Sequence, residues 1–166
     1  MRARTCFTMI STAVLAAAAL TGLGAGAAGA APTVAPCLTT ANVIMGTPAD
    51  DILIGTSGSD YIDGLGGNDV ILGLDGNDCL YGGGGEDWVY GESGNDVMAG
   101  DGGDDHLYGG SGDDTVSGNG GDDMVDGGND ANTLDGGAGT DSCYGDDTWV
   151  LTTVVNCEST FKVYAS

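Results

Sequence analysis

The chain has 166 residues, of which 25 are acidic, three are basic and 33 are glycine, and its formal charge is −22. This length suits one domain of ordinary size. The negative charge excludes nucleic acid as a partner, because binding to phosphates needs a basic surface. Charge repulsion and the entropy of glycine both oppose a compact state, so folding requires a basic partner or a cation.

The first 30 residues have the pattern of a secretory signal peptide. Arg2 and Arg4 precede an apolar run from Phe7 to about Leu23, and small residues follow up to Ala30. A membrane anchor is the alternative, but the run is short and rich in alanine, which favours export with cleavage near Ala30. No later apolar run is long enough for a membrane span. Cleavage would remove both arginines and no acid, which takes the formal charge from −22 to −24.

Residues 31–45 form a leading segment before a long periodic region. The segment ends in "ANVIM", which has the composition of a strand. We expect residues 31–45 to act as an N-terminal cap over the first layer of the periodic region, because an exposed parallel sheet edge invites aggregation.

The periodic region runs from Gly46 to Tyr144 and divides into eleven units of nine residues without insertion or deletion. Position 1 is glycine in every unit, and position 4 is glycine in nine units. Position 6 is aspartate in ten units, with Asn132 as the exception. A fixed period in several columns is typical of a repeat architecture. Position 8 is apolar throughout: Leu53, Ile62, Ile71, Leu80, Val89, Met98, Leu107, Val116, Val125, Leu134 and Cys143.

These units resemble the nonapeptide GGxGxDxUx of the RTX, or haemolysin-type, calcium-binding repeats. The resemblance covers residues 46–144, which is most of the chain. Position 2 departs from the pattern, because it is glycine in only four units.

The columns predict an all-β fold. Glycine at positions 1 and 4 permits turns with positive φ, and positions 7 to 9 make a minimal strand in which only position 8 points inward. One inward residue per unit cannot bury a core, so we expect two units per coil and parallel pairing of each strand with the one eighteen residues later. The resemblance implies the same architecture, a right-handed parallel β-roll, here an RTX solenoid of about five and a half coils with N- and C-terminal caps.

Position 6 supplies the candidate metal ligands. Stacked turns would hold the aspartates of units n and n+2 close together, where two carboxylates repel each other. Carboxylates and backbone carbonyls at flexible turns suit Ca²⁺ better than zinc, copper or Mg²⁺. The resemblance implies Ca²⁺ between successive turns, held by both aspartates and by turn carbonyls. The candidate ligands are Asp51, Asp60, Asp69, Asp78, Asp87, Asp96, Asp105, Asp114, Asp123 and Asp141.

Eight pairs of units n and n+2 keep both aspartates, which predicts up to about eight Ca²⁺ ions. The pair that contains Asn132 lacks one carboxylate. The first site is expected to be weak, because Pro48 and Ala49 replace the usual turn residues.

Residues 145–166 leave the repeat, and "TWVLTTVV" and "FKVY" predict two strand-like pieces of a C-terminal cap. The four cysteines of the mature chain suggest two disulfides in an exported protein, with three possible pairings. Cys143 is an inward residue fourteen positions before Cys157, and Cys79 could tie down the leading segment through Cys37. We therefore predict the pairs Cys37–Cys79 and Cys143–Cys157.

Together these features predict a secreted, extracellular calcium-binding protein whose repeats fold on binding Ca²⁺, as a monomer or with weak self-association. The alternative is an adhesion or surface-recognition protein, with a cell-surface or polysaccharide partner on the aromatic outer face of the odd-numbered units. Ordinary strand propensity explains the same aromatic pattern. An enzyme is not expected, because His106 is the only histidine and the chain has no GxSxG or HExxH string.

Overall fold

The structure, a computed structural model, describes residues 41–146 and 152–163. The predicted signal peptide, most of the predicted N-terminal cap and Cys37 lie outside these residues. No helix within the described ranges is long and apolar enough to cross a membrane.

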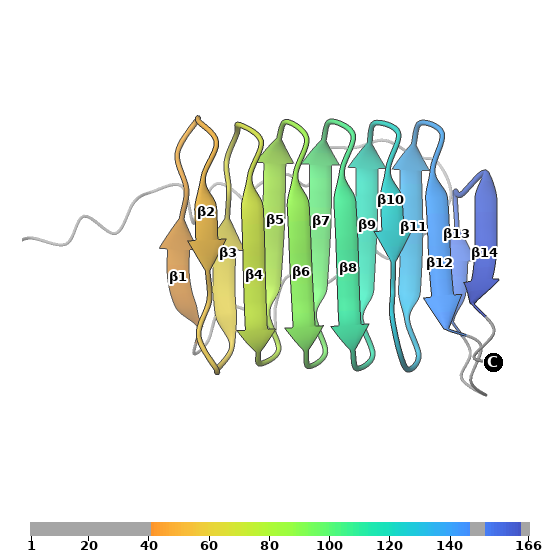
Figure 1. Ribbon diagram of the computed structural model, residues 1–166, viewed down its shortest axis with the longest axis horizontal. Helices are drawn as coiled ribbons and strands as arrows, with labels where there is room; N and C mark the ends of the chain where they lie inside the picture. The colour runs from red at the N-terminus through yellow and green to blue at the C-terminus, as the bar shows by residue number, and fades with distance from the viewer. Residues whose placement is uncertain (1–40, 147–151, 164–166) are drawn as a thin grey trace, which may run out of the picture. The chain divides into compact units, whose positions relative to one another are not determined.

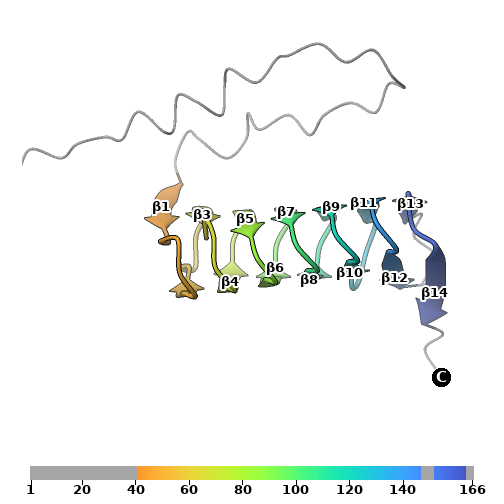
Figure 2. The ribbon, with the colours of Figure 1, turned by 90° about the horizontal axis from the view of Figure 1, so that it is seen from above.

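The described residues form two parallel sheets that face each other (Figures 1 and 2). Sheet A contains, in spatial order, β1 (Asn42–Met45), β3 (Asp60–Asp63), β5 (Cys79–Gly84), β7 (Val97–Gly102), β9 (Thr115–Gly120), β11 (Thr133–Ala138) and β13 (Thr153–Val155). Sheet B contains β2 (Ile52–Ile54), β4 (Val70–Asp75), β6 (Trp88–Ser93), β8 (His106–Ser111), β10 (Met124–Asp126), β12 (Ser142–Asp146) and β14 (Ser159–Val163).

Consecutive strands alternate between the sheets, so that each coil takes one strand from each. Within the repeat, paired residues are eighteen positions apart, as for Val89 of β6 and Leu107 of β8. The chain winds through about six such turns. The predicted all-β parallel roll with two units per coil is confirmed.

The core is one side chain thick per strand, because only position 8 points between the sheets. Ten of these side chains, from Ile62 to Cys143, form a single buried row, and Leu53 is partly buried at the N-terminal end. Ile44 and Val154 continue the row beyond the repeat. So thin a core supplies little hydrophobic energy per residue, which leaves the turns to decide whether the roll is stable.

The strands in the middle of the roll are longer than positions 7 to 9. β4 to β9 each have six residues, because positions 1 to 3 of the next unit also pair between coils, as Leu74 does with Glu92. Leu74 and Glu92 both pair in a left-handed conformation, with φ of 81° and 77°. Position 2 thus turns the chain toward the next coil while keeping the ladder intact.

Both ends of the repeat are extended by strands outside it. β1 pairs with β3, β13 pairs with β11, and β14 pairs with β12. The spacing of paired residues changes at the C-terminal end, to twenty for Leu134 with Val154 and to seventeen for Ser142 with Ser159. The two strand-like pieces of the tail therefore continue the two sheets.

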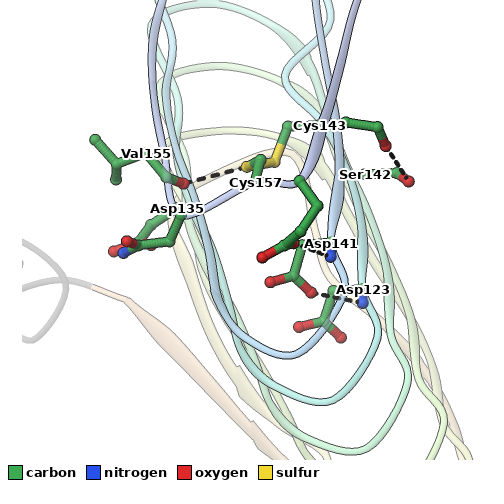
Figure 3. Close-up of a disulfide and its surroundings, with 10 residues drawn as sticks. Asp123, Asp135, Asp141, Ser142, Cys143, Val155 and Cys157 are labelled. Atoms are coloured by element: carbon green, nitrogen blue, oxygen red, sulfur yellow. Dashed lines mark hydrogen bonds between the residues drawn. A yellow bond between two sulfur atoms is a disulfide. The ribbon is translucent and has the colours of Figure 1, made fainter.

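A disulfide joins Cys143, in the core row, to Cys157 in the tail (Figure 3). This pairing was predicted from the sequence and is confirmed. Cys79 is also disulfide-bonded and is fully buried, although it occupies an outward position on β5. Its predicted partner Cys37 lies outside the described residues, so the Cys37–Cys79 pairing stays a prediction.

Candidate metal centre

The position 6 side chains lie at the turns and are removed from solvent. Asp51, in the first unit, is half-buried. At most 2% of the surface is exposed in each of the others: Asp60, Asp69, Asp78, Asp87, Asp96, Asp105, Asp114, Asp123, Asn132 and Asp141. A row of buried carboxylates is costly unless each oxygen has a partner.

In the position 6 aspartates that follow Asp60 in the chain, one carboxylate oxygen, Oδ1, accepts a hydrogen bond. The backbone N–H of Asp87 donates to Oδ1 of Asp105 at 2.9 Å, and the same bond links every described position 6 residue to its counterpart eighteen residues later. Figure 3 shows the bond from Asp123 to Asp141. In the tail, Glu158 accepts from the N–H of Asp141 and so extends the series by one layer. The aspartates of units n and n+2 are therefore neighbours, as expected.

The second oxygen of these aspartates is different. Oδ2 is buried without a hydrogen-bond partner in eight described residues: Asp69, Asp78, Asp87, Asp96, Asp105, Asp114, Asp123 and Asp141. These eight are the later members of the eight pairs in which both units keep aspartate. In the interior units each Oδ2 lies against the position 1 glycine of its own unit, for example Asp96 against Gly91. Buried polar atoms without partners are rare in proteins and point to a missing ion or water.

Burial raises the pKa of the carboxyls of Asp69, Asp78, Asp87, Asp96, Asp105, Asp114 and Asp123. It raises the pKa of Asp78, Asp96 and Asp123 to about 6, and that of Asp105 and Asp114 to about 7. The backbone N–H bonded to Oδ1 lowers each pKa, but burial outweighs it. Repulsion from neighbouring aspartates raises the pKa of Asp105 and Asp114 further. The turns therefore favour a neutralised carboxyl, which either a proton or a cation can provide.

Asn132 shows what the turn accepts in place of a carboxylate oxygen. Its Nδ2 donates to the backbone carbonyls of Asn129, Asp130 and Gly128, at 3.1, 3.4 and 3.5 Å. In this one unit an N–H donor therefore meets the turn carbonyls. An aspartate at position 6 would place a carboxylate oxygen, instead of this N–H donor, beside the turn carbonyls. Ligand sets made only of oxygen atoms are those that Ca²⁺ prefers.

The first two units satisfy their aspartates without a cation. Oδ2 of Asp51 accepts from the backbone N–H of Thr47 at 2.6 Å, and Oδ2 of Asp60 accepts from that of Thr56 at 2.6 Å. Both threonine hydroxyls bond to the same carboxylates. The weakness predicted for the first site stays a prediction, and Thr47 adds a second reason for it.

A second ladder runs through position 5 and was not expected from the sequence. Oδ1 of Asn68 accepts from the backbone N–H of Glu86 at 3.0 Å, eighteen residues later. Seven such bonds occur among the described residues, accepted by Asp50, Asn68, Asn77, Asn95, Asp104, Asp113 and Asp122. The signal was the recurrence of Asp or Asn at position 5. These side chains link stacked turns through hydrogen bonds.

Within the part of the chain that the structure describes, no three His, Cys, Asp or Glu side chains gather into a metal site. The expected ligand set, with two carboxylates per ion and backbone carbonyls as its other oxygens, would not form a group of that kind, and it stays a prediction.

A family model of RTX calcium-binding nonapeptide repeats, made of four copies, matches residues 45–80, 63–98, 81–116, 100–134 and 117–147. The chain belongs to this family. No curated protein and no solved structure matches it significantly. Membership in the RTX repeat family indicates calcium binding, and the buried, unpartnered carboxylate oxygens fit that ion.

Proposed function

We propose that this RTX-repeat chain is a secreted calcium-binding protein whose coils fold when Ca²⁺ binds between stacked turns. The observation that supports the proposal is the set of eight buried Oδ2 atoms without a hydrogen-bond partner in the described residues. They recur at the same place in every unit from the third onward, apart from the unit of Asn132. Each requires a positive charge or a proton, and at neutral pH Ca²⁺ is the cation that suits oxygen ligands at flexible turns.

The ligands of each ion would come from two units. The position 6 aspartates of units n and n+2 would supply carboxylate oxygens, and the glycine-rich turns would supply backbone carbonyls. Bound Ca²⁺ would supply positive charge where carboxylates otherwise repel one another. About eight ions would offset two thirds of the charge of −24 expected for the mature chain.

Export is consistent with this function. The disulfide between Cys143 and Cys157 fits an oxidising compartment. Extracellular calcium is plentiful enough to fill sites with dissociation constants of about 10⁻⁴ to 10⁻³ M. A calcium-poor cytosol would leave the chain unfolded for translocation by the predicted signal peptide.

The test is circular dichroism of the mature chain during a calcium titration. We expect a disordered chain in excess chelator and a β-sheet spectrum at saturation, with a sharp transition because coils can bury their core only by stacking. A mature polypeptide that is equally ordered in excess chelator would contradict the proposal.

A matched pair of variants locates the sites. Asp105 belongs to two pairs, with Asp87 and with Asp123, so Asp105→Asn should lower the number of bound ions by about two and raise the calcium midpoint. Asp75→Asn removes the same charge from an exposed position 3 side chain and should change neither quantity. Equal effects of the two substitutions would mean that total charge, rather than the position 6 sites, controls folding.

A further inference from the structure

The turn between β13 and β14 takes the place of a repeat turn, although it lies outside the repeat. β13 pairs with positions 7 to 9 of the tenth unit, and Ser159 at the start of β14 pairs with position 7 of the eleventh unit. Asn156, Cys157 and Glu158 therefore stand where a further unit would have its positions 1 to 6. We call these three residues the tail turn.

Glu158 occupies the place of a position 6 aspartate in the tail turn. Its Oε2 accepts from the backbone N–H of Asp141, just as Oδ1 of Asp141 accepts from that of Asp123. The backbone N–H of Ser159 donates to the carbonyl of Asp141 at 3.2 Å, which repeats the bond that links consecutive coils within the repeat. The series of stacked carboxylates therefore ends at Glu158 and not at Asp141.

Asn156 places a carbonyl where a repeat turn has one. In the ninth unit, a Cβ on Gly118 would meet both Oδ2 of Asp123 and the carbonyl oxygen of Gly136 in the next coil. In the eleventh unit, a Cβ on Gly136 would meet Oδ2 of Asp141, at 2.8 Å, and the carbonyl oxygen of Asn156. The carbonyl of Asn156 therefore approaches the last Oδ2 as the carbonyl of a position 1 glycine does in the repeat.

Two bonds hold the tail turn over the last unit. Nδ2 of Asn156 donates to Oδ1 of Asp135 on β11 at 2.7 Å. Cys157 is disulfide-bonded to Cys143 of the core row (Figure 3). Asn156 has a left-handed φ of 50°, which asparagine adopts more readily than most residues. The tail turn is therefore positioned by bonds that do not involve the carboxylate of Glu158.

Asp141 provides a second observation that points to an ion at the tail turn. The residue is fully buried, and its Oδ2 has no hydrogen-bond partner among the described residues. A buried carboxylate oxygen without a donor requires a proton or a cation. Two carboxylates and turn carbonyls are also the ligand set proposed for the sites within the repeat. Glu158 is exposed, and Ca²⁺ completes its coordination with water at such a place.

We propose that Asp141, Glu158 and the carbonyl of Asn156 form a calcium site beyond the repeat. This site adds one ion to those held by the eight pairs of position 6 aspartates. The proposal rests on the proposed function, because the tail turn would bind its ion in the same way as a repeat turn. The ion would join the tail to the last coil, so that closure of the C-terminal end depends on calcium as well as on the disulfide.

Isothermal titration calorimetry of Glu158→Gln tests the site. An amide oxygen keeps the bond between stacked turns, as Oδ1 of Asn132 does with the N–H of Asp114, so the substitution removes the charge and keeps the acceptor. We expect the variant to fold with calcium and to bind about one ion fewer than wild type. Glu86→Gln removes the same charge from an exposed position 5 side chain and should leave the number of ions unchanged.

A crystal structure of the mature wild-type chain in calcium is a test that needs no variant. An ion should lie about 2.3 to 2.6 Å from carboxylate oxygens of Asp141 and Glu158. Water in that place, or equal numbers of ions in wild type and Glu158→Gln, would overturn the site, because Glu158 would then only end the series of hydrogen bonds. The same loss in Glu86→Gln would also overturn it. A wild-type chain whose circular dichroism shows no folding with calcium would instead contradict the proposed function.

Discussion

At the scale of single residues, Asn132 shows what an amide does at position 6, where the other ten units have aspartate. Its Nδ2 donates to three turn carbonyls in the place where other units direct a carboxylate oxygen. We expect Asn132→Asp to raise the number of bound Ca²⁺ ions by about one, because it completes the pair with Asp114. Without calcium the variant should be less stable, since it loses these bonds and buries another charge. Isothermal titration calorimetry measures the stoichiometry.

The control for this variant is Asn129→Asp, which adds the same charge at an exposed position 3 side chain of the same unit. It should leave the stoichiometry unchanged. An equal number of ions in wild type and Asn132→Asp would mean that the amide bonds at this turn do not occupy a calcium site.

The position 1 glycines are required by space. A Cβ on Gly91 would meet Oδ2 of Asp96, and it would come within 2.6 Å of the carbonyl oxygen of Gly109 in the next coil. We expect Gly91→Ala to lower the free energy of unfolding in calcium by about 1 to 3 kcal/mol, as overpacking does elsewhere. Urea denaturation measures this change.

Gly84→Ala is the matched control, because an added Cβ there has only the carbonyl oxygen of Gly102 nearby, at 4.0 Å. Its effect should stay within about 1 kcal/mol of wild type. If both alanine variants unfold at the same urea concentration, an added Cβ at position 1 does not crowd the carboxylate enough to lower stability.

The sequence could predict which residues approach each other at the turns, but not which atoms bond. Asp87 and Asp105 are neighbours because their column repeats every nine residues and two units fill a coil. In these aspartates Oδ1 accepts a hydrogen bond from a backbone N–H, whereas Oδ2 has no donor. This difference depends on side-chain rotamers, which a repeat in the sequence does not specify. The position 5 ladder was missed because Asp and Asn are common in turns for local reasons.

At the scale of elements, the coil was predictable and the strand length was not. Positions 7 to 9 have strand propensity, whereas positions 1 to 3 are rich in glycine, which is disfavoured in isolated strands. Stacking overrides this preference, because Leu74 and Asp75 pair with Glu92 and Ser93 of the next coil. Local propensity therefore underestimates the length of strands whose backbone N–H and C=O groups find hydrogen-bond partners only in the next coil.

The C-terminal end of the roll is held by the Cys143–Cys157 disulfide. We expect the double variant Cys143→Ser, Cys157→Ser to be less stable than wild type by about 3 kcal/mol in saturating calcium. The two cysteines are 14 residues apart, and a disulfide that closes a loop of about 15 residues in the unfolded chain contributes about this much stability. Hydrogen exchange should show that β13 and β14 lose protection first. Uniform loss of protection along the roll, or an unchanged urea midpoint, would show that the tail does not depend on the bond.

At the scale of the whole molecule, the proposed role of charge in folding predicts that protons can replace calcium. The buried carboxyls of Asp105 and Asp114 have a pKa of about 7 in the folded chain, against about 3.9 for an unfolded aspartate. The folded state therefore binds more protons, so its stability is greatest below about pH 4 and is lost as the pH rises to about 7. Without calcium, acidification from pH 8 should order the chain.

Circular dichroism against pH in calcium-free buffer measures this acid-induced folding, with sedimentation to detect aggregates near the isoelectric point of about 4.1. In the presence of calcium the dependence reverses, since protons compete with Ca²⁺ for the same Oδ2 atoms and the calcium midpoint should rise as the pH falls below 7. The two curves together are decisive. A roll held by hydrophobic contacts alone would show neither, whereas neutralisation of the buried carboxylates requires both.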